Sequence, residues 1–163
     1  MQFWLLFLLG FTCSCWSLGI DQQQPIHFSA GEIEWDHSQS QGLFKNQVHF
    51  QQGSTRLDAS SGRSEGDTQH QFKKIIMYGD KEKQAHFVTL PNPKDSLVNA
   101  YADKMIYLPL KKVIVLKGHV HVIQGRYDFS APYVRYNTEL KKLITKKTNT
   151  QQTTITIQPE TPS

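Results

Sequence analysis

One eleven-residue pattern occurs twice in this chain, and this repetition constrains the fold more than any other feature. Residues 115–125 read VLKGHVHVIQG, and residues 43–53, which lie 72 positions earlier, read LFKNQVHFQQG. Internal repetition of this kind predicts an architecture built from similar units. We therefore expect two similar halves. The residues that are identical in the two copies are Lys45, Val48, His49, Gln52 and Gly53, which recur as Lys117, Val120, His121, Gln124 and Gly125.

Each copy of the pattern is predicted to be a β-hairpin. An apolar pair leads into Lys-Asn in the first copy and Lys-Gly in the second, and Asn and Gly tolerate the positive φ that tight turns need. Apolar and polar residues then alternate, with Val48 and Phe50 in one copy and Val120 and Val122 in the other. Such alternation is typical of a strand with one buried face.

The remaining sequence also reads as short strands and turns. The offset of 72 residues carries Ile33 and Trp35 onto Met105 and Tyr107. Residues 60–71 contain no apolar side chain and are predicted to be a loop, whereas residues 153–157, TTITI, are predicted to be the last strand. Nothing in residues 20–163 shows sustained helical periodicity, so the predicted fold class is all-β.

The first 19 residues are predicted to be a signal peptide. Residues 3–11 form an apolar run that is shorter than the ~20 residues needed to span a bilayer, and cleavage is expected before Ile20. No Lys or Arg precedes the run, so retention as a membrane anchor stays an alternative. Cleavage removes Cys13 and Cys15 and leaves no thiol. Residues 20–158 are predicted to be one domain and residues 159–163 a flexible tail.

Charge is distributed unevenly along the chain. Residues 20–70 carry a net charge of −4 and residues 71–163 a net charge of +8. One interpretation is solvated strands, in which Lys guards sheet edges against aggregation. In the other, the two ends attract each other between molecules, or the basic half faces an anionic ligand.

The residues give little sign of catalytic or metal chemistry. His119 and His121 would share one face of a strand and could bind zinc together, but no third ligand is evident nearby. No phosphate-binding loop and no nucleophile elbow occurs. We expect no cofactor, no metal, no nucleic-acid partner and no enzymatic activity.

The alternating strands predict a large apolar inner face. On physical grounds alone it is either an ordinary sandwich core or the lining of a sandwich that is open along one side and holds acyl chains. The inward set is predicted to be Ile26, Phe28, Ile33, Trp35, Phe44, Val48, Phe50, Leu57, Phe87, Val98, Met105, Tyr107, Ile114, Leu116, Val120, Val122 and Phe129.

Three segments resemble the LptA/OstA family. They are QPIHF at residues 24–28, ADKMIY at residues 102–107 with the VLKGHV that follows at 115–120, and YGD at 78–80 before AHF at 85–87. Their order and spacing together are specific, and they span about residues 24–144. The loop predicted at residues 60–71 departs from the family pattern.

The resemblance implies a periplasmic protein of the lipopolysaccharide export machine, with a twisted, V-shaped β-jellyroll fold. Lipid A acyl chains would travel in its groove. Its partners would be lipopolysaccharide, a membrane-anchored jellyroll component at the inner membrane, an outer-membrane assembly protein, and further copies of itself stacked head to tail. The residues expected to line the groove are Ile26, Phe28, Ile33, Trp35, Phe44, Phe50, Phe87, Met105, Leu116, Val120 and Val122.

The two terminal strands are predicted to be the edges at which copies join. A head-to-tail contact would bring the acidic half of one copy to the basic half of the next, and it would extend without closing. Two alternatives remain: the membrane-anchored jellyroll of the same machine, and a structural envelope protein that binds no lipid. The predicted edge residues are Pro25, Ile26 and His27 at one end and Thr153, Thr154, Ile155, Thr156 and Ile157 at the other.

Overall fold

The computed structural model describes residues 24–69, 71–149 and 151–159. The signal peptide and the last four residues of the predicted tail lie outside these ranges. Within them the fold is all-β, as predicted, with one short 3₁₀ turn (η2, Pro109–Lys111). The strands are β1 (Ile26–Ser29), β2 (Glu32–Asp36), β3 (Gln41–Gln52), β4 (Thr55–Gly66), β5 (Phe72–Tyr78), β6 (Ala85–Thr89), β7 (Val98–Ala102), β8 (Lys104–Leu108), β9 (Val113–Gln124), β10 (Tyr127–Asn137), β11 (Lys142–Lys146) and β12 (Thr154–Ile157).

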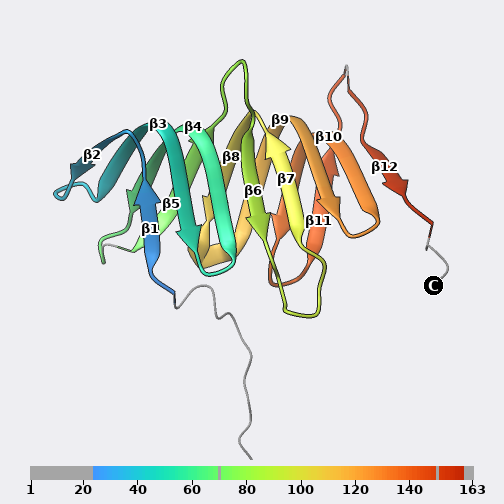
Figure 1. The fold of residues 1–163 in the computed structure, drawn as a ribbon, viewed down its shortest axis with the longest axis horizontal. Helices are drawn as coiled ribbons and strands as arrows, with labels where there is room; N and C mark the ends of the chain where they lie inside the picture. Colours follow the sequence, from blue (N-terminus) through green and yellow to red (C-terminus); the bar gives the residue numbers. More distant parts are fainter. Residues whose placement is uncertain (1–23, 70, 150, 160–163) are drawn as a thin grey trace, which may run out of the picture.

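The strands form two antiparallel layers. The four longest strands bend, and each of them contributes to both layers. The first layer runs β1-β3-β4-β6-β7-β9-β10-β12, and the second runs β2-β3-β4-β5-β8-β9-β10-β11. In Figure 1, β1, β6 and β7 lie in front of β5, β8 and β11. The bends in β3, β4, β9 and β10 therefore join the two layers along one side, which we call the crossing side.

The prediction of two similar halves is confirmed. Strands β1 to β6 form the first half and β7 to β12 the second, with the same order of short and long strands. The unusual backbone positions repeat at the same offset of 72 residues. Positive φ occurs at Ser40, Asn46, Gln47 and Gly53, and again at Lys112, Gly118, His119 and Gly125.

The predicted hairpin turn at Lys-Asn and Lys-Gly is wrong, although the positive φ is there. Asn46 and Gln47 have φ values of 62° and 59°, but they form a bulge in one continuous strand, since the pairing with β4 jumps from Lys45 to Val48. An extra residue in one strand bends it and increases its twist, so β3 crosses from one layer to the other. The reversal comes later, at Gly53, whose φ is 57°.

The loop predicted for residues 60–71 is wrong over residues 60–66, because β4 continues to Gly66, and it is right for residues 67–69 and 71. Its inward positions are small for a packing reason. A Cβ added to Gly62 would lie 2.5 Å from Met77 Sδ, so the side chains of β5 occupy the space that larger residues of β4 would need. Composition identified a polar segment correctly, but it could not show that a neighbouring strand fills the interior.

The two halves join through β5 with β8 and through β6 with β7. These pairings close a ring of six strands, β4-β5-β8-β9-β7-β6, a feature that the predicted open sandwich did not include. β1, β2 and β3 lie outside the ring at one end, and β10, β11 and β12 lie outside it at the other. β2 and β12 lie at opposite ends of the molecule (Figure 1).

The core fills the middle of the sandwich. Phe87 lies at its centre: it is fully buried and pairs with Leu57 on β4 and Ala100 on β7. The buried cluster is Phe44, Val48, Phe50, Leu57, Ile75, Met77, Ala85, Phe87, Val98, Ala100, Ala102, Met105, Tyr107, Ile114, Leu116, Val120, Val122, Ala131, Val134 and Tyr136.

Phe87→Ala is expected to lower the free energy of unfolding by about 3–5 kcal/mol, because the change removes buried apolar contacts and leaves a cavity. Chemical denaturation measures this loss. Leu140→Ala is the control, since Leu140 is 69% exposed and its truncation should cost less than about 0.5 kcal/mol. Equal losses for the two variants would contradict this description of the core.

Candidate functional site

The candidate site is the interior between the two layers. Most of the predicted groove residues lie in its closely packed middle. Phe44, Phe50, Phe87, Met105, Leu116, Val120 and Val122 are all no more than 3% exposed. Their inward orientation is confirmed, but in this conformation they form a core. That they line a lipid groove stays a prediction.

The first half ends in an aromatic cluster around Phe28. The Phe28 ring stacks on Phe44 with centroids 4.3 Å apart and an interplanar angle of 9°. It also meets Phe50 at 5.2 Å and Phe72 at 5.5 Å. Because β1 and β2 lie outside the ring of strands, Phe28 is only partly buried, and so is Ile26.

Ile33 and Trp35 lie on the inner face, as predicted, but they are not buried there. Ile33 pairs with Phe44, a core residue, so the two side chains share one face. Ile33 is nevertheless 49% exposed and Trp35 39% exposed. Among the described strands, β2 pairs with β3 alone, and the Trp35 ring centre lies 5.8 Å from that of Phe72. The inner apolar surface therefore reaches solvent at this end.

The other end exposes apolar side chains in the same way. Ile155 and Ile157 on β12 pair with Phe129 and Tyr127, and they are 51% and 54% exposed. Leu143 on β11, in the other layer, packs against the core. The predicted role of Ile155 and Ile157 was that of sheet-edge residues only, although the alternation of Thr and Ile indicates an apolar face. Apolar surface is thus exposed at both ends of a closed middle.

The side opposite the crossing side carries the turns at residues 53–54 and 125–126 and the loop between β6 and β7 (Figure 1); we call it the turn side, and the interior is polar there. Ser40, Gln52, Thr55, Ser64 and Thr89 are all at least 93% buried, and they lie at or beside strand ends next to these turns. Thr55 Oγ1 lies 2.9 Å from Thr89 Oγ1. The interior therefore changes from apolar at its centre to polar along the turn side.

Two contacts span the layers on the turn side. Lys141 Nζ, between β10 and β11, lies 2.6 Å from Asp95 Oδ2, between β6 and β7. Burial raises the pKa of the nearby Tyr136 hydroxyl, and the negative charge of Asp95 raises it further. These loop contacts hold the layers together where no strand crosses between them.

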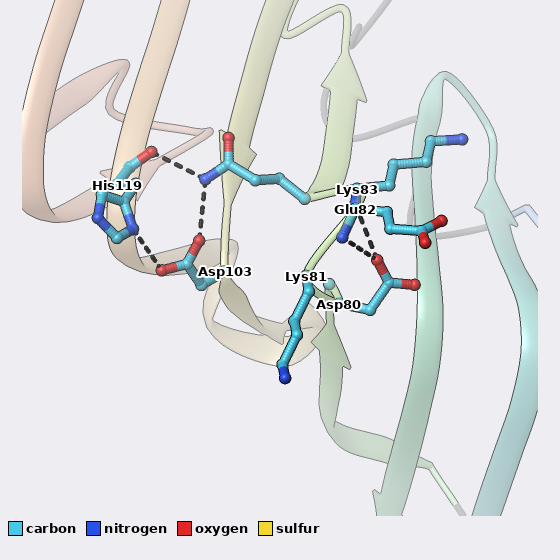
Figure 2. Close-up of a pocket in the computed structure, with 8 residues that line it drawn as sticks. Asp80, Lys81, Glu82, Lys83, Asp103 and His119 are labelled. Carbon is cyan, nitrogen blue, oxygen red and sulfur yellow. Dashed lines mark hydrogen bonds and ion pairs between the residues drawn. The ribbon is translucent and has the colours of Figure 1, made fainter.

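A polar pocket of about 630 Å³ lies on the crossing side, where the two halves meet (Figure 2). Gln84 Nε2 donates to Asp103 Oδ1 and to the carbonyl oxygen of His119, both at 3.0 Å, and His119 Nδ1 lies 2.8 Å from Asp103 Oδ2. Burial raises the pKa of Asp103, but the hydrogen bonds from His119 and Gln84 outweigh it and leave the pKa below its ordinary value.

The hydrogen bonds in this pocket connect the two halves of the fold, which indicates a structural role. Gly79 N donates to Asp103 O at 2.9 Å, and Asp103 N donates to Gly118 O at 3.0 Å, so these hydrogen bonds connect the end of β5 and the start of β8 to the bend in β9. A hydrogen bond from Ser60 lowers the pKa of Asp80, and the N–H groups of Lys83 and Glu82 lower it further. An Asp-His pair is present, but no serine, cysteine or threonine lines this pocket.

The family model described as LptA/(LptD N-terminal domain) LPS transport protein matches residues 27–142, most of the chain. The chain belongs to this family. The match runs from His27 in β1 to Lys142 at the start of β11, and so includes both copies of the bulged strand and the junction between the halves.

The chain is also similar to an individual LPS transport protein in sequence and in structure. The chain is 26% identical over 123 residues to the lipopolysaccharide export system protein LptH of Pseudomonas aeruginosa, a match that covers 76% of this chain and 69% of that protein. The crystal structure of LptH, the LptA homologous periplasmic component of the lipopolysaccharide transport device from Pseudomonas aeruginosa, aligns with a TM-score of 0.79 and 24% identity, covering 86% of this chain and all of that chain. This likeness shows the shared fold.

The two histidines that could share a zinc ion, His119 and His121, contact different carboxylates. His119 pairs with Asp103, whereas His121 Nε2 lies 2.7 Å from Asp128 Oδ1 on the neighbouring strand. The two side chains are thus held by different carboxylates, and no group of three metal-binding side chains occurs in the described part of the chain. No helix among the described residues is long and apolar enough to span a membrane.

Proposed function

We propose that the chain is a periplasmic lipopolysaccharide transport protein that holds acyl chains between its two layers. The proposal rests mainly on the apolar interior, which is exposed at both ends of the molecule. The exposed residues are Ile33 and Trp35 at one end and Ile155 and Ile157 at the other, in a chain that belongs to this family. An acyl chain in water costs ~0.8 kcal/mol for each exposed CH₂ group. An apolar path between the layers removes most of that barrier.

The change in polarity across the interior gives the lipid an orientation. Acyl chains would contact the apolar centre, and the polar head group would lie at the turn side near Thr55 and Thr89. For chains to enter, the layers must part at the turn side, where the Lys141–Asp95 ion pair holds them. In this proposal, the V-shaped jellyroll is the conformation in which the two layers have parted at the turn side. Residues 20–158 would act as one domain.

We further propose that copies stack head to tail through the joint that already connects the two halves. Within the chain, Tyr78 pairs with Lys104 and Phe87 with Ala100. Lys146 occupies the position in the second half that Tyr78 occupies in the first half. Lys146 pairs with Tyr133 and Tyr78 pairs with Ser61, and Tyr133 lies 72 residues after Ser61. Glu32 holds the place of Lys104 at the same offset. Lys146 would therefore face Glu32 of the next copy.

Extending this register defines the whole joint. On the outer face of the second layer, Lys142 would face Asp36 and Lys146 would face Glu32 of the next copy. On the inner face of the first layer, Ile155 would face Phe28 and Ile157 would face Ile26. The exposed apolar surfaces of the two ends would thus become one continuous interior. The edge residues Pro25, His27, Thr153, Thr154 and Thr156 complete the strand pairing.

The same edges would receive the partners at the two ends of such a bridge. These are the membrane-anchored jellyroll at the inner membrane and the lipopolysaccharide assembly protein at the outer membrane. If residues 1–19 were retained as an anchor, the chain would itself be the membrane-anchored component. N-terminal sequencing of the exported protein distinguishes the two, because the proposal expects Ile20 at the start.

The substrate class is tested by comparing lipopolysaccharide with its deacylated saccharide. The purified chain should bind the acylated form in a pull-down or by calorimetry, and it should bind the deacylated saccharide at least about 100-fold more weakly, because only acyl chains gain from the apolar interior. Equal binding of the two ligands would contradict a lipid-holding interior and would favour a structural protein of the envelope.

A further inference from the structure

The outer face of the second layer carries a row of cations and tyrosines that crosses five strands. The register places Tyr78 beside Lys104, Lys104 beside Lys117, Lys117 beside Tyr133 and Tyr133 beside Lys146. Lys104 Nζ lies 5.1 Å from the centre of the Tyr78 ring, and Lys146 Nζ lies 5.5 Å from that of Tyr133. We call the outer face of β5, β8, β9, β10 and β11 the basic face.

The neighbouring row on the same face is apolar except for one arginine. It reads Ile76, Ile106, Val115, Arg135 and Ile144 across the same strands. Ile144 is 39% exposed, and Ile106 and Val115 are partly exposed. Adjacent strands are ~4.8 Å apart, so the two rows form a patch about 19 Å wide.

The charge of the basic face is not balanced. No outward position on the part of β5, β8, β9, β10 and β11 that forms this layer is acidic. Among the described residues, Lys104, Lys117 and Arg135 have no carboxylate within 4.0 Å, unlike Lys74 and Lys112, which pair with Glu65 and Glu139. On β2, by contrast, the outward residues of the same layer are Glu32, Glu34 and Asp36.

We propose that the basic face docks the protein onto the surface of an anionic lipid bilayer. Lysine and arginine attract anionic head groups, tyrosine places an apolar ring and a polar hydroxyl at the boundary between water and lipid, and Ile106 and Ile144 add apolar contact. A small soluble anion would use the cations alone. The proposed stacking uses strand edges, so the basic face stays accessible in a bridge, and the docking does not depend on lipid being held inside.

Vesicle co-sedimentation tests this inference on the chain that begins at Ile20, which contains every described strand. The variant Lys104→Gln/Lys117→Gln/Arg135→Gln removes three cations from the basic face. The control Lys81→Gln/Lys83→Gln/Lys94→Gln removes three exposed cations from the loops around β6. Both variants have the same net charge. Vesicles of phosphatidylcholine with phosphatidylglycerol are compared with vesicles of phosphatidylcholine alone.

The wild-type chain is expected to bind the anionic vesicles and to release them as salt is raised. Each basic residue near an anionic surface contributes ~1 kcal/mol, so the triple variant should bind about 100-fold more weakly, whereas the control should change less than about threefold. The inference is overturned if the two variants lose the same affinity, or if neutral vesicles bind as well as anionic ones.

Two further measurements keep the result interpretable. A thermal melt of each variant shows whether it is folded, and Lys117→Gln/Arg135→Gln, which leaves the Lys104–Tyr78 contact in place, should lose about 30-fold if the triple variant melts early. Binding of soluble lipopolysaccharide is measured in parallel. It should survive in the triple variant, so the docking surface and the lipid-holding interior succeed or fail separately.

Discussion

Replacing Lys142 and Lys146 with glutamate is expected to leave a folded chain that no longer forms head-to-tail oligomers. In the proposed joint these lysines face Asp36 and Glu32 of the next copy, so the variant sets four carboxylates against one another. Opposite charges across two strands stabilise the pairing, and like charges destabilise it by a similar amount. Reversing two pairs should weaken association by about 2 kcal/mol, or about 30-fold, as measured by sedimentation velocity.

The complementary variant decides whether the register is correct. Glu32→Lys/Asp36→Lys should fail to associate for the same reason, but an equal mixture of the two variants should form oligomers again, because each joint then brings a carboxylate to an ammonium group. Lys81→Glu/Lys83→Glu has the same net charge as the first variant and should associate normally. A mixture that stays monomeric while both variants are folded would contradict the proposed joint.

Phe28→Asp is expected to reduce lipopolysaccharide binding by about 100-fold. The Phe28 side chain contacts Phe44, Phe50 and Phe72, so an acyl chain held there would meet an unpaired carboxylate, which costs several kcal/mol in apolar surroundings. Binding is measured by calorimetry below the concentration at which copies associate, because Phe28 also lies at the proposed joint.

His27→Asp is the matched control. His27 is the preceding residue on the same strand, is exposed and points to the opposite face of the sheet, so its substitution should change binding less than about threefold. A thermal melt is needed for both variants. Phe87 is unsuitable for this test because it is fully buried, and a carboxylate there should unfold the chain. Equal losses at positions 27 and 28 would mean that the lipid does not occupy the interior.

The repeat made most of the fold predictable. Alternation assigned the inward side correctly even at Ile33, which shares a face with Phe44. The error at Lys45-Asn46 has a physical origin, since a hairpin turn and a bulge both need positive φ, and local sequence does not show whether the chain then reverses or continues. The error at residues 60–66 arose because the residues that fill the space beside Gly62 belong to β5.

The sequence predicted which residues of the candidate site point inward, but it did not predict whether the interior is filled or open. Hydrophobic patterning selected Phe50, Phe87 and Met105 as inward residues, but it could not distinguish a filled core from an open groove, since both require the same apolar face. The polar lining of the turn side was missed, because Thr55 and Thr89 look like ordinary strand residues until pairing brings them together. The row of Lys104 and Lys117 beside two tyrosines also depends on pairing between distant strands.

Photo-crosslinking in living cells tests the central claim most directly. A photoreactive amino acid is placed at Phe28 in one strain and at His27 in another, and the irradiated protein is blotted for lipopolysaccharide. If acyl chains travel between the two layers, the adduct should form at position 28 and be absent or weak at position 27. Adducts of equal strength at both positions, or an adduct at position 27 alone, would contradict transport through the interior.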